Sequence, residues 1–252
     1  MDLGIKDKVV LVTGGARGLG RVDALQFAAE GCRVALCDIN AEAIQKVAGE
    51  IGRAGGIARP YVCDISKPEQ IQQMLNDIET SWKPVDILIN NAALLDNIQM
   101  LEKMEDAMWV RDINVNLTGT YNVTKVCFEG MKKQNWGRII SMSSVAGVLG
   151  GFGQTSYAAS KGGILAFMRS VALEGGKFNI TANSVVAGLV RTEAYEYVSP
   201  KMRERIERRT VLGRAAQTEE VIAAILFLAS EQARYITGSE IYVTGGIHLF
   251  TF

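Results

Sequence analysis

Histidine is nearly missing from this chain of 252 residues, and cysteine and proline each occur only four times. The single histidine, His248, cannot assemble a metal site by itself, so metal catalysis is not expected. The cysteines are Cys32, Cys37, Cys63 and Cys127; they show no C-x-x-C spacing, and three lie on or beside apolar runs. We therefore expect reduced thiols, buried in the core of a protein from a reducing compartment.

An excess of charge of either sign is also absent. The 27 basic and 27 acidic residues cancel and are dispersed, which argues against a nucleic acid or an anionic membrane as partner. The densest run of charges, 203–209, mixes both signs and indicates a solvated helix face. No window reaches the ~18 apolar residues of a membrane span, and the N-terminus lacks a charged-then-apolar signal segment. These absences predict a cytoplasmic protein.

No proline-rich linker, repeat or low-complexity segment divides the chain. Its length and its apolar content of 48% suit one α/β domain over residues 1–252. Strand-like apolar runs recur at 9–12, 33–37, 58–62, 85–89, 138–142, 181–186 and 240–243. Helical patterns separate them at 18–30, 41–53, 68–81, 105–133, 156–177 and 218–230. Strands that alternate with helices imply right-handed crossovers and a parallel sheet.

A glycine-rich turn, Thr13-Gly14-Gly15-Ala16-Arg17-Gly18-Leu19-Gly20, follows the first of these runs. A strand, a glycine turn and the start of a helix form an anion site, because backbone N–H groups and the helix dipole point at a phosphate. The spacing Gly-x-x-x-Gly-x-Gly is one residue longer than the dinucleotide fingerprint, so that fingerprint is not assigned. The second run ends at Asp38, about where an acidic side chain meets the ribose hydroxyls of adenosine.

Tyr157 and Lys161 lie in the segment Tyr-Ala-Ala-Ser-Lys, with Ser144 upstream. Positions four apart share a helix face, so the ammonium of Lys161 can reach under the Tyr157 ring. A phenol titrates near pH ~10 in water, and a cation a few ångströms away favours the phenolate. The pair predicts a tyrosine with a lowered pKa that serves as a general base near neutral pH. By itself the same spacing also suits an ordinary solvated helix face.

Seven segments in order along the chain match one family. They are Thr13 to Gly20, Cys63-Asp64-Ile65, Asn90-Asn91-Ala92-Ala93, Asn116-Leu117-Thr118-Gly119, Gly137-Arg138-Ile139-Ile140 running to Ser143-Ser144, Tyr157-Ala158-Ala159-Ser160-Lys161, and Ala187-Gly188-Leu189-Val190-Arg191-Thr192. Over essentially its whole length the chain resembles the short-chain dehydrogenase/reductases, in particular their NAD-dependent alcohol dehydrogenases and 3-oxoacyl reductases. The resemblance implies a single-domain Rossmann-type fold, a doubly wound parallel sheet of about seven strands with helices on both faces. It also implies a homotetramer built through two long helices.

The residues that match Asn116, Ser144, Tyr157 and Lys161 form the catalytic tetrad of that family. Ser144 stands thirteen residues before Tyr157, which is the family's interval, so the neighbouring Ser143 is less suited. The resemblance implies that Ser144 binds the substrate oxygen and that Tyr157 exchanges a proton with it. Lys161 would lower the pKa of Tyr157 and hydrogen-bond the nicotinamide ribose. Asn116 would interrupt its helix and hold a water, and the hydride chemistry belongs to the cofactor.

Asp38 indicates that the cofactor is NAD. A carboxylate there accepts hydrogen bonds from both ribose hydroxyls and repels the 2′-phosphate of NADP. Arg17 complicates this prediction, since a basic residue before the second glycine of the motif often accompanies NADP in the family. No basic residue directly follows Asp38, because Ile39 and Asn40 come next.

The other nucleotide contacts follow from the resemblance: the adenine edge, the ribose and the nicotinamide carboxamide each have two matching residues. The complete predicted set is Gly14, Arg17, Gly18, Leu19, Gly20, Asp38, Asp64, Ile65, Asn91, Ala92, Tyr157, Lys161, Val190 and Thr192. Three positions depart from the family pattern: Ala93 and Ala187 replace a glycine and a proline, and Thr244 precedes Gly245-Gly246 where an aspartate is usual.

Residues 191–214, the longest segment without a strand-like run, would form a lid over the substrate. Apolar side chains that could line the substrate pocket are Leu94, Leu95, Val145, Phe152, Leu189, Tyr195, Tyr197, Val198 and Met202. They favour a hydrophobic or cyclic secondary alcohol or its ketone, although they could equally just pack the lid against the body.

The leading hypothesis is therefore an NAD-dependent secondary-alcohol dehydrogenase that runs toward the ketone. Basic residues near the lid would suit a carrier-bound or coenzyme A thioester, so a 3-oxoacyl-thioester reductase is the alternative; these residues are Arg191, Lys201, Arg203 and Arg205. A third hypothesis, of another class, is a non-catalytic scaffold that senses the cofactor. The intact pair of Tyr157 and Lys161 argues against it.

Overall fold

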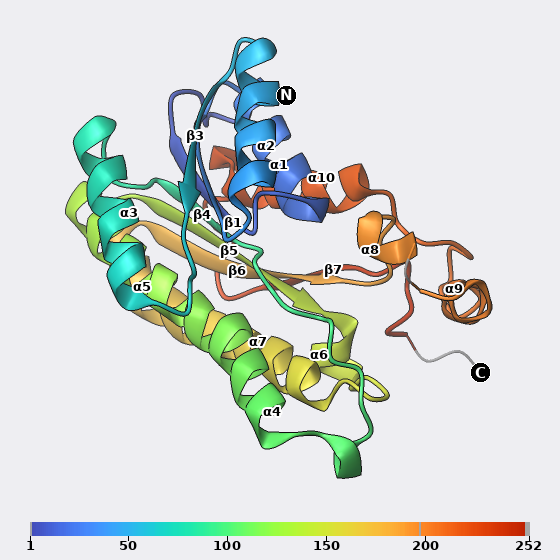
Figure 1. Cartoon of the computed structure of the whole chain (residues 1–252). Helices are drawn as coiled ribbons and strands as arrows, with labels where there is room; N and C mark the ends of the chain where they lie inside the picture. The colour runs from blue at the N-terminus through green and yellow to red at the C-terminus, as the bar shows by residue number, and fades with distance from the viewer. Residues whose placement is uncertain (1, 197, 250–252) are drawn as a thin grey trace.

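Seven strands in the described part of the chain form one parallel sheet with the order β3-β2-β1-β4-β5-β6-β7 (Figure 1). The computed structural model describes residues 2–196 and 198–249. The strands are β1 (Val9–Thr13), β2 (Arg33–Asp38), β3 (Ile57–Val62), β4 (Ile87–Asn90), β5 (Gly137–Ser144), β6 (Ile180–Ala187) and β7 (Glu240–Val243). The order reverses between β1 and β4, the point at which ligands bind in open α/β sheets. The predicted doubly wound, Rossmann-type sheet is confirmed.

Helices cover both faces of this sheet. The α-helices are α1 (Gly18–Ala29), α2 (Ala41–Arg53), α3 (Pro68–Ser81), α4 (Asp106–Ile113), α5 (Thr120–Gln134), α6 (Val145–Leu149), α7 (Thr155–Gly175), α8 (Glu193–Glu196), α9 (Pro200–Glu207) and α10 (Thr218–Ala229). Helices α1, α2 and α10 lie on one face, and α3, α5 and α7 lie on the other (Figure 1). Among the described residues, none of the helices combines the length and apolar character that crossing a bilayer requires.

The two faces of the sheet carry separate hydrophobic cores. In β1, Val10 and Val12 pack into the core beneath α1, α2 and α10, whereas Val9 and Leu11 pack into the opposite core. Side chains alternate between the faces of a strand, and both faces are buried here, so β1 is an unbroken apolar run rather than an alternating one.

The helical pattern predicted over 105–133 is confirmed as a continuous run of helical residues from Asp106 to Gln134, but the run is not α-helical throughout. The structure has α4, then a π-helical segment η2 (Asn114–Gly119), then α5. Asn116 lies in η2, and the hydroxyl of Thr120 donates a hydrogen bond to its carbonyl oxygen at 2.8 Å. Such short π segments occur often at functional sites. Apolar periodicity did not reveal the interruption because the apolar face continues on both sides of it.

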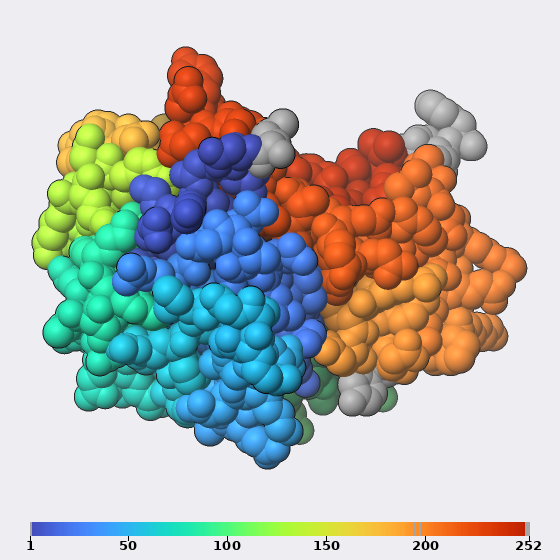
Figure 2. All heavy atoms as spheres, turned by 90° about the horizontal axis from the view of Figure 1, so that it is seen from above, coloured from blue at the N-terminus to red at the C-terminus, as the bar shows by residue number. Residues whose placement is uncertain are grey.

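The predicted lid contains two short helices, α8 and α9. Pro200 begins α9, where a missing N–H costs no hydrogen bond, and the charged run predicted as a solvated helix face lies mostly on this helix. Figure 2 shows the region around residues 190–210 as a lobe to one side of the body. Tyr197, one of the residues predicted for the pocket, lies outside the described residues.

Candidate active site

The predicted site residues gather where the strands end. Gly14 follows β1, Asp38 ends β2, Asn91 follows β4, Ser144 ends β5 and Gly188 follows β6. Because all the strands are parallel, these ends lie along one edge of the sheet.

The glycine turn is held tightly against the loop after β4. Gly14 has a φ of +66°, and a Cβ atom there would lie 2.8 Å from the Cα of Ala92. A Cβ atom on Gly20 would lie 2.2 Å from the carbonyl oxygen of Gly14. The amide of Asn91 donates hydrogen bonds to the carbonyl oxygens of Thr13 (3.0 Å) and Gly14 (3.1 Å). The side chain of Asn91 therefore supports the turn, a role that the resemblance alone did not indicate.

The carboxylate of Asp38 faces this turn. Its Oδ2 accepts a hydrogen bond from the backbone N–H of Ala16 at 3.1 Å, and its Oδ1 accepts one from Asn40 N–H at 3.0 Å. Arg17 is exposed to solvent beside it. The carboxylate is thus held at the tip of β2 by two backbone donors.

The N-terminus of α1 is already bound by the carboxylate of a side chain from another segment. The N–H of Gly18 donates a hydrogen bond to the carboxylate of Glu193, at 3.0 Å from Oε2. The first turn of α1 contains no acidic residue, and Arg17 provides no side-chain cap. This carboxylate comes from α8 in the predicted lid, so the N-terminus of α1 and the lid are in contact. The sequence analysis did not single out Glu193, because a glutamate directly after the nicotinamide motif carries no local signal.

Tyr157 and Lys161 share a face of α7, as predicted. The Lys161 ammonium lies 5.7 Å from the centre of the Tyr157 ring and donates a hydrogen bond to the carbonyl oxygen of Met142 at 2.7 Å. Lys161 is only 3% exposed, and burial lowers its pKa to about 8. The ammonium is therefore anchored to β5 within reach of the Tyr157 ring.

The predicted lowering of the Tyr157 pKa is wrong for this arrangement. Burial raises the pKa of Tyr157, and the hydrogen-bonding interaction with the Ser144 side chain lowers it by less. The physical reason is that burial disfavours both the phenolate and the ammonium that was expected to stabilise it. Tyr157 is therefore a protonated phenol, and hence a proton donor, near neutral pH.

The two neighbouring serines at the end of β5 have different partners. Ser143 is buried, and its hydroxyl donates to the carbonyl oxygen of Lys161 at 2.9 Å, which ties α7 to the sheet. Ser144 is half-buried, accepts a hydrogen bond from Ala146 N–H at 3.2 Å and interacts with Tyr157. The arrangement agrees with the choice of Ser144 for the chemistry, which rested on its interval to Tyr157.

Asn116 is fully buried and clamps the loop after β4. Its Oδ1 accepts from Leu94 N–H at 2.7 Å, and its Nδ2 donates to Leu94 C=O at 3.0 Å and to the Ser160 hydroxyl at 3.4 Å. The predicted local interruption of its helix is confirmed by η2. Asn116 thus joins loop 91–100 to α7, the helix that carries Tyr157.

Of the remaining residues predicted to contact the nucleotide, three lie near the N-terminal half of the sheet: Asp64, Ile65 and Leu19. Asp64 closes its own turn by accepting a hydrogen bond from Ser66 N–H at 2.9 Å, and the Ile65 side chain is buried against Gly119. Any contact of Ile65 with adenine would therefore use its backbone. Leu19 lies half-buried in the first turn of α1.

Val190 and Thr192 lie where the lid begins. Val190 forms a β-bridge with Ala216, and Thr192 N–H donates to the carbonyl oxygen of Val190 at 2.9 Å. This bridge joins the two ends of the segment 191–214. Glu207 fastens the segment further, because it accepts hydrogen bonds from the Tyr195 hydroxyl at 3.0 Å and from Ala215 N–H at 3.2 Å.

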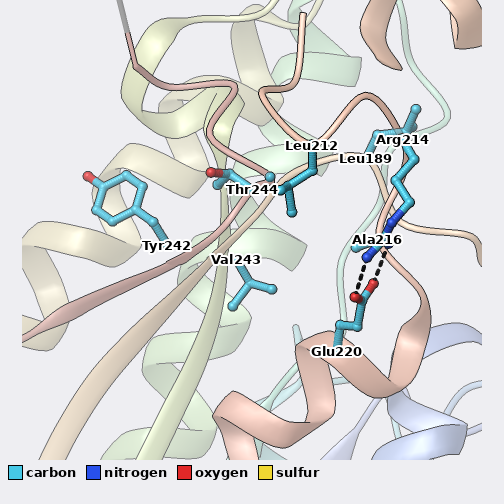
Figure 3. A pocket seen from close by; sticks show the side chains of 9 residues that line it. Leu189, Leu212, Arg214, Ala216, Glu220, Tyr242, Val243 and Thr244 are labelled. Atoms are coloured by element: carbon cyan, nitrogen blue, oxygen red, sulfur yellow. Dashed lines mark hydrogen bonds and ion pairs between the residues drawn. The ribbon is translucent and has the colours of Figure 1, made fainter. Parts of the chain in front are cut away.

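A cavity of about 210 Å³ opens where β6 and β7 end, and Figure 3 shows its lining. Its wall includes a double ion pair between Arg214 and Glu220, with N–O distances of 2.7 and 2.6 Å. Leu189, predicted for the substrate pocket, lines this cavity, and so does Thr244. The Thr244 hydroxyl contacts His248 Nδ1 at 2.7 Å and accepts from Gly246 N–H at 3.3 Å, so this departure from the family pattern supports the C-terminal turn.

A nicotinamide dinucleotide needs an anion-binding turn and a proton donor beside its reacting carbon, and this edge of the sheet supplies both. Gly14 and Gly20 let the turn pack tightly against its own backbone and the loop after β4, and the Gly18 amide already binds a carboxylate. The residues therefore fit such a cofactor. The chain belongs to the short-chain dehydrogenase/reductase family of oxidoreductases, which act with a nicotinamide cofactor.

The family model that matches residues 14–248 is described as enoyl-(acyl carrier protein) reductase. The chain is 37% identical to the 3-oxoacyl-[acyl-carrier-protein] reductase FabG of Thermotoga maritima, over 96% of this chain and 98% of that protein. It is 36% identical to FabG of Aquifex aeolicus, over 98% and 100% of the two chains. A further relative is the (2S)-[(R)-hydroxy(phenyl)methyl]succinyl-CoA dehydrogenase subunit BbsD of Thauera aromatica, with 34% identity over 98% and 99%.

Proposed function

We propose that this protein reduces 3-oxoacyl thioesters to 3-hydroxyacyl thioesters, with NADH as the hydride donor. The observation that carries the proposal is the protonated, half-buried Tyr157 beside Ser144 at the edge of the sheet. A proton donor near neutral pH suits the reduction of a ketone, which gains a proton on oxygen as it gains a hydride on carbon. The relatives named above act on acyl groups carried by acyl carrier protein or coenzyme A, which supports a thioester substrate.

In the proposed ketone reduction, each of the four residues would have its own role. The Ser144 hydroxyl donates a hydrogen bond to the ketone oxygen and orients it, and the Tyr157 hydroxyl transfers its proton to that oxygen as negative charge develops. Lys161, held on Met142, hydrogen-bonds the nicotinamide ribose and supplies positive charge beneath the phenol. Asn116 holds loop 91–100 in place. When bound, the nicotinamide supplies the hydride.

NAD is the proposed cofactor because of Asp38. Its carboxylate is fixed by Ala16 N–H and Asn40 N–H, so it would accept hydrogen bonds from ribose hydroxyls without reorganisation. A 2′-phosphate would lie against this fixed negative charge, and an exposed, flexible Arg17 offsets only part of that repulsion.

Exposed apolar and basic side chains both occur on segments predicted to meet the substrate. Leu95, Phe152 and Met202 are exposed, and they belong to loop 91–100, the turn before α7 and helix α9. Lys201 and Arg205 project from α9 as well, and both are solvent-accessible. Apolar surface suits an acyl chain and the basic groups suit a phosphorylated carrier arm, so residues 191–214 are proposed as a lid that closes over this substrate.

A second candidate function is the dehydrogenation of hydrophobic or cyclic secondary alcohols. The exposed apolar side chains Leu95, Phe152 and Met202 favour it. The test is a panel of 3-oxoacyl and 3-hydroxyacyl thioesters of coenzyme A and of a short carrier mimic, beside cyclic and aromatic alcohols and ketones. Each is assayed with both nucleotides through the absorbance of the reduced nicotinamide. The proposal expects the highest kcat/KM for 3-oxoacyl thioesters with NADH. Turnover of cyclic alcohols alone selects the second candidate, and nucleotide binding without any turnover selects a cofactor-sensing scaffold.

We also propose that the protein is a homotetramer in the cytoplasm. Support for assembly comes from the surface of α5 and α7, where Tyr121 and Leu173 are exposed and a cavity of about 320 Å³ lies between aromatic side chains. Support for a reducing compartment comes from the cysteines, all four of which are free and buried. Sedimentation velocity tests the assembly.

A further inference from the structure

Asp112 lies at the end of α4, is 3% exposed, and has no part in the chemistry described above. Its two carboxylate oxygens have separate partners. Oδ2 accepts hydrogen bonds from the Ser156 hydroxyl at 2.7 Å and from Asn97 Nδ2 at 3.3 Å. Oδ1 accepts from Arg111 Nε at 3.2 Å and Nη2 at 2.9 Å. One buried carboxylate thus joins α4, the first turn of α7 and loop 91–100.

The same arrangement recurs one helical turn further along. Asn116 follows Asp112 by four residues, and Ser160 follows Ser156 by four residues. Asn116 contacts the Ser160 hydroxyl on α7 and pairs with the backbone of loop 91–100, as Asp112 contacts Ser156 and Asn97. Two sets of hydrogen bonds, which we call rungs, therefore connect the helical run α4–η2 with α7 and with loop 91–100. The first rung is centred on Asp112 and the second on Asn116. Tyr157 lies on α7 between the rungs, directly after Ser156.

The chemistry of the first rung favours positioning over general packing. Burial of a carboxylate is costly unless donors satisfy it, and an apolar side chain would join two helices without that cost. A charged acceptor, however, makes stronger and more directional hydrogen bonds than a neutral one. Asp112 makes such hydrogen bonds with the hydroxyl of Ser156, next to Tyr157, and with the side-chain amide of Asn97 in loop 91–100.

We propose that Asp112 is a positioning residue, which holds Tyr157 and loop 91–100 in the geometry that proton transfer requires. It does not touch the reacting atoms and acts through Ser156 and Asn97. The inference rests on the proposed function, because it assigns the proton transfer to Tyr157. Without the carboxylate, the first turn of α7 and the loop lose their common anchor. A displacement of about 1 Å in a catalytic group can lower a rate roughly 100-fold.

The test compares Asp112→Ala, Asp112→Asn, Ser156→Ala and the double variant Asp112→Ala/Ser156→Ala. Asp112→Ala is expected to lower kcat by roughly 10- to 100-fold and to change the KM for the nucleotide less than about twofold, since the glycine turn is unaffected. Ser156→Ala lowers kcat in the same direction, and the double variant is no slower than Asp112→Ala, because both remove one interaction. Asp112→Asn recovers most of kcat, since its amide oxygen still accepts from Ser156.

Asp86→Asn is the matched control. Asp86 is a buried carboxylate at the opposite end of the strands, where it accepts a hydrogen bond from Val9 N–H at 2.7 Å. Its substitution lowers the free energy of unfolding and leaves kcat unchanged. Equal losses of kcat in Asp112→Ala, Asp112→Asn and Asp86→Asn would show a purely structural role and overturn the proposal.

Hydrogen exchange supplies a measurement that does not depend on turnover. Peptides from 92–100 and 155–161 are expected to exchange faster in Asp112→Ala than in the wild type and in Asp86→Asn. Unchanged exchange in both segments overturns the positioning role even if kcat falls. A wild type that turns over no substrate refutes the proposed function alone, because the exchange experiment still tests the anchor.

Discussion

The ammonium of Lys161 lies 5.7 Å from the centre of the Tyr157 ring and donates a hydrogen bond to the carbonyl oxygen of Met142. Burial acts on both groups: it raises the pKa of Tyr157 and lowers the pKa of Lys161 to about 8. Tyr157 is therefore prepared to donate a proton, and two predictions concern this pair.

The two directions of the reaction should differ in their pH dependence. Reduction uses the protonated phenol and should keep its rate across the neutral range. Oxidation uses the phenolate, so its kcat should rise with pH into the alkaline range, because the raised pKa leaves little phenolate at about pH 7. Tyr157→Phe should lower kcat in both directions by roughly 100-fold or more while the nucleotide still binds. Steady-state rates over the pH range check this, and a flat oxidative profile would contradict it.

Lys161→Met should extinguish turnover and yet stabilise the fold. Below about pH 8 the wild type carries a buried ammonium whose pKa is lower in the folded state than in the unfolded state. The folded state then binds fewer protons than the unfolded one between pH 8 and the ordinary value of 10.5, so wild-type stability rises with pH across that window. The advantage of the variant should be about 3 kcal/mol at neutral pH, less the lost hydrogen bond, and should shrink by pH 10.5.

Urea unfolding at neutral and alkaline pH measures this difference. Lys133→Met, at an exposed position near the end of α5, is the control and should show no such trend. A Lys161→Met variant that is less stable than the wild type at neutral pH would refute the assignment of a desolvated ammonium.

Asp38→Ala should narrow the preference for NADH over NADPH. The substitution removes the carboxylate that would bond the ribose hydroxyls and repel a 2′-phosphate. The ratio of kcat/KM for the two nucleotides is expected to fall by roughly 10- to 100-fold, which corresponds to about 1.4–2.8 kcal/mol. A wild type that uses NADPH as well as NADH would show instead that Arg17 outweighs Asp38.

Glu193→Ala should tighten nucleotide binding. The Glu193 carboxylate occupies the Gly18 amide that a pyrophosphate would use, so binding has to displace it. A charge-assisted hydrogen bond contributes about 1 kcal/mol or more, and the Kd for NADH is expected to fall roughly fivefold. Fluorescence titration measures the Kd, with Glu204→Ala on α9 as a control that leaves it unchanged. Weaker binding in Glu193→Ala would mean that the lid glutamate supports the nucleotide site.

Asp23 should make the fold less stable as pH rises. It is fully buried in α1, neither carboxylate oxygen has a hydrogen-bond partner among the described residues, and burial raises its pKa well above the ordinary value. A raised folded-state pKa gives stability that is complete in acid and lost as pH passes through that pKa. Asp23→Asn should match the wild type in acid and exceed it by about 1–3 kcal/mol in alkali. Denaturant midpoints that move in parallel across the pH range would contradict this.

Local sequence patterns were enough to predict the strands of the sheet. Each strand is a short apolar run bounded by a turn, and burial on both faces makes such runs conspicuous, so the predicted strands agree with the observed ones to within a few residues. Within the helical run predicted over 105–133, periodicity alone gave no sign of the π-helical segment η2, which contains Asn116 and its contact with Leu94, 22 residues away. Only the folded chain brings those two residues together.

The candidate site also has a part that the sequence predicted and a part that only the structure revealed. Helix spacing indicated that Tyr157 and Lys161 share a face, and the resemblance to a family, carried by motifs in order along the chain, implied roles for Ser144 and Asn116 beside them. Glu193 at Gly18 and Asp112 at Ser156 could not be predicted, since each contact joins segments 44 or more residues apart.

The sequence by itself therefore determined the fold class, and it placed the proposed reacting groups at one edge of the sheet. The tertiary structure decided their protonation and their supports, which are a neutral phenol, an ammonium with a lowered pKa and a buried carboxylate behind the first turn of α7. The reason is that covalent spacing sets which side chains are near one another along an element. Desolvation and hydrogen bonding depend on everything else that packs around them.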